Sequence, residues 1–128
     1  MKEPVWIDEI ITKAIHADQI IQHGGSPGIR DKNLLSASLA RPRHLFIYGE
    51  PNLFELAAAY GYSLAKNYPF IDGNKRTAFM VMYTFLGVNN YLLEVPEAEV
   101  VTMMEQLATG EENQESLGRW LTENSVEI

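Results

Sequence analysis

The side chains best suited to chemistry lie in one short stretch, "NYPFIDGNKRTAF", at positions 67–79. It brings a phenol at Tyr68, a carboxylate at Asp72 and two cations at Lys75 and Arg76 within the length of one loop. Adjacent cations attract an anion, and a carboxylate beside a bound anion serves best as a ligand for a metal ion that the two share. The stretch therefore predicts an anion site with a place for Mg²⁺.

A loop that leads into a helix would hold these groups. Pro69 disfavours helical geometry at Tyr68, and Asp72-Gly73 favours a tight turn. Apolar residues return at helical spacing after Asn74, so a helix is predicted to begin there. A helix start presents unpaired N–H groups and a partial positive charge, which together attract an anion. Phosphate is the expected anion.

Lys75 and Arg76 support the interpretation of an anion site. Cations in the first turn of a helix interact unfavourably with the helix dipole, and each lowers helix stability by roughly a few tenths of a kcal/mol. A bound anion would offset that cost. Simpler interpretations stay open on the spacing alone: Asp72-Gly73 is often only a turn, Asn74 only a helix cap, and the two cations only a solvated pair.

Two other ligand-binding loops do not fit the stretch. A Walker-type phosphate loop needs a glycine well upstream of its Gly-Lys-[Ser/Thr] end, and "NYPFIDGNKRT" has none. A calcium-binding loop that began at Asp72 would need a glutamate at its twelfth position, where Tyr83 stands. Both are excluded.

The elements that must position this loop are mostly helices. Apolar periodicity, capping residues and breakers predict helices over residues 6–23, 31–42, 53–67, 74–88, 96–110 and 114–124. Pro42 is predicted to end the second helix, and residues 43–50, between Pro42 and Pro51, are predicted to form a protruding hairpin, which we call the flap. The "YLLEV" segment after the fourth helix is a candidate strand. The chain is thus expected to be a single, mainly α domain over residues 1–128 with about six helices.

The first helix has an apolar stripe that is predicted to pack on one face. Its members are Ile7, Ile10, Ile11, Ala14, Ile15 and Ile21. His16 and His23 lie seven residues apart in the same helix and could share a face, but no third ligand is near in the sequence. They are predicted to be structural.

The amino-acid composition of the chain argues against several classes of function. Seventeen acidic against ten basic side chains give a net charge of −7, which argues against nucleic acid as a direct partner. The absence of cysteine excludes disulfides, thiolate metal sites and cysteine nucleophiles. No run of about 18 apolar residues exists, and the start "MKEPVWIDEI" lacks the basic and apolar regions of a signal peptide, so a cytoplasmic protein with no membrane partner is expected.

Residues 68–76, "YPFIDGNKR", resemble the motif His-x-Phe-x-Asp-x-Asn-Lys-Arg of the Fic/Doc family's Doc branch at every specified place except the first. The similarity extends through "GGSPGIRD", "SLARPRHLF" and "GEPNLFELAAAYGYSLAKN", so it covers most of the chain. The resemblance implies a helical Fic/Doc fold whose flap, here residues 43–50, holds a segment of the target protein by strand-like pairing.

The resemblance also implies roles for the loop residues, with ATP and Mg²⁺ as cofactors. Phe70 would anchor the loop, Asp72 would bind Mg²⁺, and the phosphates of ATP would be held by Gly73, Asn74, Lys75 and Arg76. Lys75 stands where AMP-transferring Fic proteins have glycine, which implies a Doc-type kinase that transfers the terminal phosphate to a protein hydroxyl. AMP transfer remains the alternative.

Doc-type proteins are toxins of toxin-antitoxin pairs, so the resemblance implies two protein partners. One is a substrate of the translation elongation factor class, and the other is an antitoxin. The family's self-inhibiting signature, [Ser/Thr]-x-x-x-Glu-[Gly/Asn], fails here because Arg119 precedes Glu123-Asn124 at its first place. Inhibition is therefore expected in trans.

Tyr68 stands where the family has its catalytic histidine. Imidazole, with a reference pKa of about 6.5, accepts protons at neutral pH, whereas a phenol near 10 is a donor. General-base catalysis contributes about 10²- to 10⁴-fold, so transfer is expected to be impaired while the phosphate pocket stays intact. Tyr68 is either an engineered knockout or a natural variant, and a phosphate-accepting hydroxyl or a phenolate stabilised by Lys75 and Arg76 is a third possibility. The rival function is a non-catalytic module that binds nucleotide or peptide.

Overall fold

A computed structural model of the chain describes residues 1–128 and contains six helices and two short strands. None of the helices is both long enough and apolar enough to cross a membrane. The prediction of a mainly helical fold of about six helices is confirmed. In chain order the elements are α1 (Glu9–His23), α2 (Lys32–Tyr48), α3 (Leu53–Asn67), α4 (Asn74–Val88), β1 (Tyr91–Leu93), α5 (Glu97–Thr109), α6 (Gln114–Glu123) and β2 (Ser125–Glu127).

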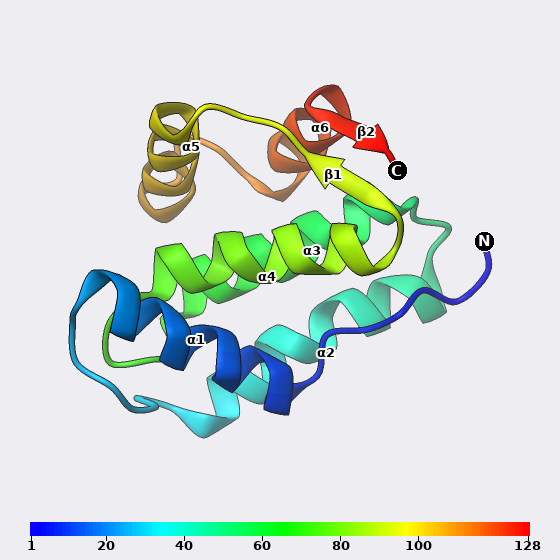
Figure 1. Ribbon diagram of the computed structural model, residues 1–128. Helices are drawn as coiled ribbons and strands as arrows, with labels where there is room; N and C mark the ends of the chain where they lie inside the picture. The colour runs from blue at the N-terminus through cyan, green and yellow to red at the C-terminus, as the bar shows by residue number, and fades with distance from the viewer.

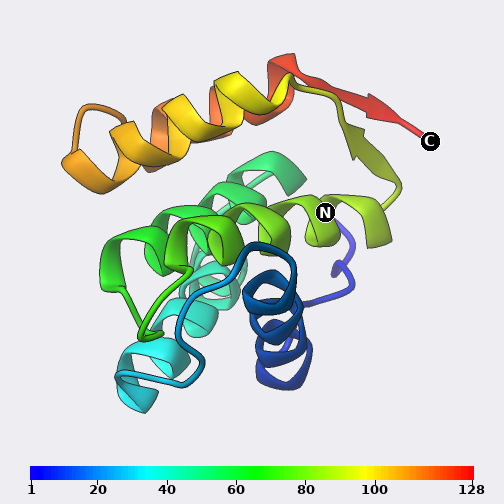
Figure 2. The ribbon, with the colours of Figure 1, turned by 60° about the vertical axis from the view of Figure 1, so that its left-hand side comes forward.

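Helices α3 and α4 form the centre of the molecule (Figure 1), and every other helix packs on one or both of them. In the same view α1 and α2 lie below this pair, and α5 and α6 lie above it. Figure 2 shows the same order after rotation, with the α1–α2 connection passing beside the α3–α4 loop. The loop predicted to carry chemistry therefore joins the two central helices.

Small residues explain why α3 can be central. It buries Ala57, Ala58, Ala59 and Gly61, which project from more than one side of the helix and let neighbouring backbones approach closely. A Cβ at Gly61 would stand only 2.1 Å from the Met82 sulfur of α4, so nothing larger than glycine fits while that side chain stays in place. Leucine and aromatic side chains fill the rest of the core on both sides of α3.

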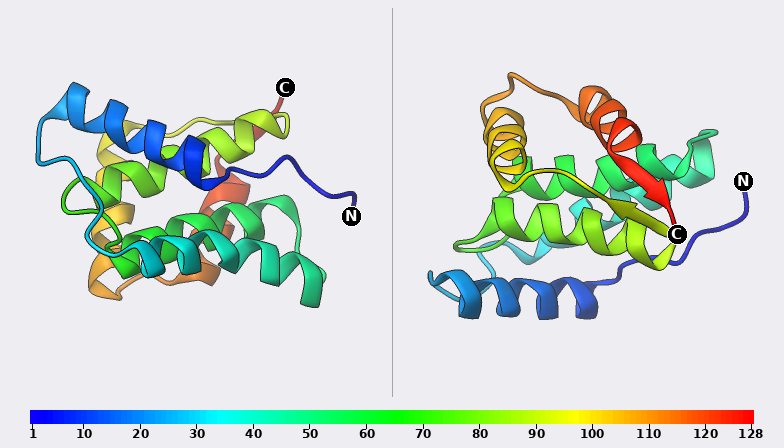
Figure 3. Two further views of the ribbon diagram at one scale, coloured as in Figure 1. Left: turned by 90° about the horizontal axis from the view of Figure 1, so that it is seen from below. Right: turned by 45° about the horizontal axis from the view of Figure 1, so that its top comes forward.

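Side chains of Asp8, Asp31, Asn52 and Asn113 cap α1, α2, α3 and α6 by accepting a hydrogen bond from a first-turn N–H. The predicted cap at Asp31 is thereby confirmed. The extended "YLLEV" piece is also confirmed, since β1 pairs antiparallel with β2 near the chain's end. The right-hand view of Figure 3 shows the two strands side by side at the end of α6.

The prediction that Pro42 ends the second helix is wrong, because α2 continues through it to Tyr48. Proline has no N–H, so the carbonyl of Ser38, four residues earlier, loses its helical partner. The Ser63 hydroxyl of α3 lies 2.9 Å from that oxygen and shares its proton between it and the Ala59 carbonyl at 2.6 Å. A partner from another helix thus lets α2 run on.

The predicted flap is wrong for the same reason. Residues 43–48 are the last two turns of α2, and Gly49 ends the helix by donating its N–H to the Leu45 carbonyl at 2.9 Å. Main-chain groups inside a helix are already paired and cannot add a target strand. Residues 43–48 therefore cannot hold a target segment by strand-like pairing.

The apolar stripe predicted for the first helix does not all face the core. Ile10 and Ile21 are 78% and 83% exposed, whereas Thr12, His16 and Gln19 are buried. Those three polar residues recur at helical spacing on the face of α1 that meets α4 and its preceding loop. Of the three, His16 bonds to the loop, at the Asp72 carbonyl, whereas the Thr12 hydroxyl donates to the Asp8 carbonyl at the start of its own helix.

Candidate active site

The α3–α4 loop begins with a strained residue at the position of Tyr68. Tyr68 has φ 48° and ψ 55°, the left-handed region that side chains disfavour, and it ends α3. Arg30 holds this turn, donating from Nε to the Tyr68 carbonyl at 2.6 Å and from Nη2 to the Asn67 carbonyl at 2.8 Å. The Tyr68 ring is 42% exposed and its hydroxyl bonds to nothing in the chain.

Phe70 anchors the middle of the loop in the core. It is 2% exposed and stacks on the buried His16 ring, with centroids 3.9 Å apart and planes 6° from parallel. The Nε2 atom of His16 lies 2.8 Å from the Asp72 carbonyl, to which it donates in the tautomer that satisfies both groups. His16 is thus a structural residue of the site, as the sequence indicated, and it orients the peptide that follows Asp72.

Asn74 closes the loop with its side-chain amide. Oδ1 accepts from the Phe70 N–H and Nδ2 donates to the Phe70 carbonyl, both at 2.9 Å. With its side-chain amide bonded to the Phe70 peptide, Asn74 can offer an anion its backbone N–H, which has no partner in the chain. The residue at the cap position of α4 is Gly73, whose φ of +75° suits glycine and which has no side chain to cap with.

The start of α4 is accordingly open. The N–H groups of Asn74, Lys75 and Arg76 donate to nothing in the chain, and no side chain caps them. Lys75 and Arg76 are exposed and neither has an acidic partner, since the chain's two ion pairs, Lys13–Glu9 and Arg119–Glu115, lie elsewhere. Three free amides and two unpaired cations make this corner strongly attractive to an anion.

Asp72 stands at the edge of this corner with its carboxylate exposed. Hydrogen bonds from the Ser26 N–H to Oδ2 at 3.2 Å and from the Gly73 N–H to Oδ1 at 2.8 Å lower the pKa of Asp72. The group is therefore held in its charged form. No three His, Asp or Glu side chains gather anywhere in the chain to enclose an ion. One charged carboxylate suits a hard cation such as Mg²⁺ that takes its remaining ligands from phosphate and water.

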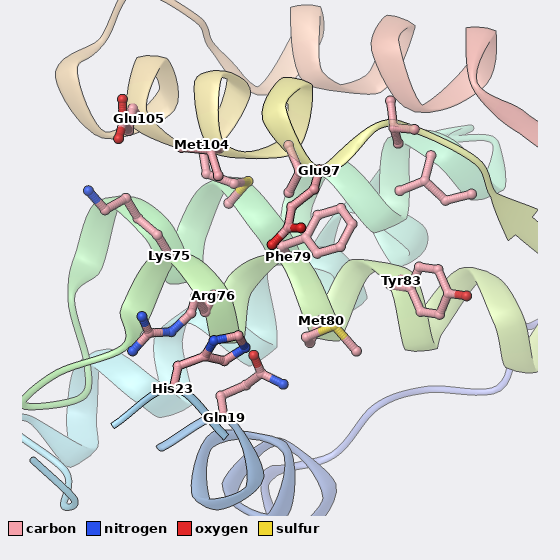
Figure 4. A pocket seen from close by; sticks show the side chains of 14 residues that line it. Gln19, His23, Lys75, Arg76, Phe79, Met80, Tyr83, Glu97, Met104 and Glu105 are labelled. Atoms are coloured by element: carbon pink, nitrogen blue, oxygen red, sulfur yellow. The ribbon is translucent and has the colours of Figure 1, made fainter. Parts of the chain in front are cut away.

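A cavity of about 580 Å³ opens from the same corner (Figure 4). Lys75 and Arg76 stand at one end, and the apolar wall between α4 and α5 includes Phe79 and Met104. His23 lies on the α1 side. The cavity thus joins a cationic end to an apolar and aromatic wall.

The structure brings all the predicted site residues into one loop and one helix start. Sequence reasoning missed Arg30 and the Gly24–Ser26 segment, which reach the loop from the α1–α2 connection. These groups reach the loop through contacts between residues more than 30 positions apart, which local sequence patterns do not reveal. In the sequence, the helical spacing of Thr12, His16 and Gln19 is the one signal of the buried polar face of α1.

Comparison with known proteins agrees with this architecture. The family model described as the Fic/DOC family matches residues 6–86, which include α1 to α3 and most of α4. The chain is 42% identical over 96 residues to a protein named Toxin Doc from Mycolicibacterium smegmatis, covering 70% of this chain and 72% of the relative. It is 35% identical over 100 residues to Protein kinase doc from Escherichia phage P1, covering 77% and 78%. The chain belongs to the Fic/Doc family, and the relatives it matches are Doc proteins.

Proposed function

We propose that this chain is a Doc-type toxin that binds ATP with Mg²⁺ and is built to transfer the terminal phosphate to a protein hydroxyl, but that Tyr68 impairs the transfer. The observation that carries the proposal is the open start of α4. Three free N–H groups, Lys75 and Arg76 converge there beside the charged Asp72. The phage relative's name, Protein kinase doc, supports phosphate transfer.

Each group has a distinct task in this proposal. The backbone N–H groups of residues 74–76 and the Lys75 and Arg76 side chains hold the phosphates and stabilise charge that builds up during transfer. Asp72 would hold Mg²⁺, which when bound neutralises phosphate charge. The cavity of Figure 4 offers its apolar wall to the nucleoside. Phe70, Asn74 and Gly73 keep the loop in shape through the contacts described above.

Tyr68 limits catalysis because it occupies the position from which a base would take the proton of the attacking hydroxyl. A phenol donates rather than accepts, so about 10²- to 10⁴-fold of rate enhancement is lost. Binding of ATP should survive this loss, since no phosphate-holding group depends on residue 68. The expected behaviour is binding without appreciable turnover.

The proposed setting is the cytoplasm, with two protein partners. The substrate is a protein hydroxyl, with a translation elongation factor as the first candidate, and an antitoxin supplied in trans restrains the toxin. The relative named Toxin Doc supports the toxin role. A net charge of −7 does not favour direct binding to nucleic acid.

Radiolabelling tests the proposal. The unmodified chain and its Tyr68→His variant are incubated with cell extract and ATP labelled at the γ or the α phosphate. γ label on protein, at least about 10²-fold stronger with Tyr68→His, is expected. α label would instead indicate AMP transfer. A Tyr68→Phe variant is the matched control, because it removes only the hydroxyl; if it loses activity that the unmodified chain has, the phenol is itself an active group.

A non-catalytic binding module is the second candidate, and the phenol at residue 68 favours it. In that case the cavity binds nucleotide or a peptide and regulates a partner without transfer. No label on protein from either the unmodified chain or its Tyr68→His variant, together with calorimetric binding of ATP and Mg²⁺, would support this candidate. Growth arrest on expression of Tyr68→His alone would support the toxin instead.

A further inference from the structure

The segment Gly24–Ser26, between α1 and α2, contacts both charged groups at the edge of the site. The Ser26 N–H donates to Oδ2 of Asp72 at 3.2 Å, and the Gly24 carbonyl accepts from Nη2 of Arg76 at 3.2 Å. A main-chain donor thus meets the anion and a main-chain acceptor meets the cation, so each charge is matched by the backbone group of suitable polarity.

Gly25, between these two contacts, has no room for a side chain. Its φ is +117°, and a Cβ there would lie 2.6 Å from Oδ2 of Asp72 and 3.2 Å from its Cγ. The main chain therefore passes against the carboxylate itself. Any side chain at this position would push Asp72 away from its present place.

The segment is anchored at both ends. On the α1 side the Gly24 N–H donates to the Ile20 carbonyl at 2.8 Å. Beyond Ser26, the Gly28 carbonyl accepts from the Ile71 N–H at 3.1 Å, and Ile29 pairs with Phe70 in an antiparallel bridge. A segment tied to α1 and to the site loop is preorganised, so it can hold a side chain in one geometry.

We propose that Gly24–Ser26 is a positioning clamp, which fixes the Asp72 carboxylate and the Arg76 guanidinium relative to each other so that a metal-bound nucleotide meets both. The inference rests on the proposed function. Outer partners of metal-binding side chains typically matter by about 10- to 100-fold in affinity, so the clamp is expected to be visible as a change in Mg²⁺-dependent binding.

Calorimetric titration of ATP, with Mg²⁺ and separately with EDTA, tests the clamp in Gly25→Ala. Affinity in Mg²⁺ is expected to fall about 10- to 100-fold, and affinity in EDTA to change about 3-fold or less. Gly110→Ala is the matched control, because Gly110 also has a positive φ, +90°, but lies in open space at the end of α5. A side chain there also meets an unfavourable positive φ, but it contacts nothing, so the variant is expected to bind as the unmodified chain does.

Two results would overturn the clamp and leave the proposed function intact: Gly25→Ala binding like Gly110→Ala, or losing affinity equally with and without Mg²⁺. No binding of ATP and Mg²⁺ by the unmodified chain would overturn both proposals. Amide exchange of Ser26 in the unmodified chain gives a test that does not depend on folding of the variant. Protection of the Ser26 N–H that persists when ATP and Mg²⁺ are added supports the clamp, and loss of protection on binding contradicts it.

Discussion

Helices α1 and α3 both pack against α4, but they bury side chains of opposite character. α3 buries leucines, alanines and Gly61, which make close apolar contacts. α1 buries Thr12, His16 and Gln19 and leaves Ile10 and Ile21 in solvent. The difference indicates two roles: α3 supplies the stability of the fold, and α1 supplies His16, which contacts the loop at the start of α4.

Removing a large side chain from α3 should give the largest loss of stability. Leu64 is 1% exposed, so Leu64→Ala is expected to lower the free energy of unfolding by about 2–5 kcal/mol through lost burial and a cavity. Urea unfolding measures this loss. Affinity of the folded fraction for ATP and Mg²⁺ should stay unchanged, and a large drop in that affinity would contradict the division between the two helices.

Tyr60 of α3 is the next test, because its buried hydroxyl bonds to the main chain of the segment that precedes α1. It accepts from the Ile7 N–H at 3.0 Å and donates to the Ile7 carbonyl at 3.1 Å. Tyr60→Phe leaves both buried groups unpaired and should cost about 1–3 kcal/mol in urea unfolding.

Alkaline pH tests the same hydroxyl without mutation. Burial raises the pKa of Tyr60 from 10.0 to about 12, so the fold favours the neutral phenol. The associated stability is fully present below pH 10 and is lost as the pH rises towards 12, because only the unfolded chain ionises readily in that interval. Unfolding free energies measured across this range should fall more steeply for the unmodified chain than for Tyr60→Phe.

His16 of α1 should show the reverse pattern, with a small effect on stability and a clear effect on the site. His16→Leu removes the donor to the Asp72 carbonyl and should cost about 0.5–1.5 kcal/mol, while weakening the binding of ATP and Mg²⁺. His16→Gln is the matched control because it retains an N–H donor on a side chain of similar reach. If both variants bind as the unmodified chain does, α1 has no part in shaping the loop.

The smallest expected effect is a gain at Gly87, in the last turn of α4. A Cβ there meets nothing within 4 Å, so Gly87→Ala should stabilise the fold by about 0.5–1 kcal/mol through helix propensity. Gly61→Ala is expected to destabilise the fold, because overpacking against Met82 outweighs the gain in helix propensity. Thermal melting of the two variants compares an open helix position with the packed centre.

How far the sequence predicted this structure depended on whether each residue's partner was near in the chain. Pro69, Asp72-Gly73 and the apolar period after Asn74 are local signals, and they gave the loop and the start of α4 correctly. The fold class followed from similar patterns in the other helices. The sequence leaves Asn74 open as a helix cap, whereas the structure places Gly73 at the cap position, so the first amides of α4 have no side-chain partner.

The errors came from partners that are distant in the sequence. No window around Pro42 contains Ser63, so the local signals predict that α2 ends at Pro42 and that a flap follows, and both predictions are wrong. The isoleucine pattern predicts an apolar buried face for α1, yet Ile10 and Ile21 are exposed and His16 is buried, where it bonds to the Asp72 carbonyl. Arg30 and Ser26 reach the site through contacts that only the folded chain forms.

The proline within α2 links the residues that evolution can accept in α2 to those in α3. Since the Ser63 hydroxyl donates to the Ser38 carbonyl, which Pro42 leaves without a helical partner, the proline is tolerated only while the serine is kept. A lineage that replaces the serine by alanine gains from restoring an ordinary residue at position 42, and one that has lost the proline is free to vary the serine. Loss of the serine is therefore expected only in descendants of this chain that have already replaced the proline.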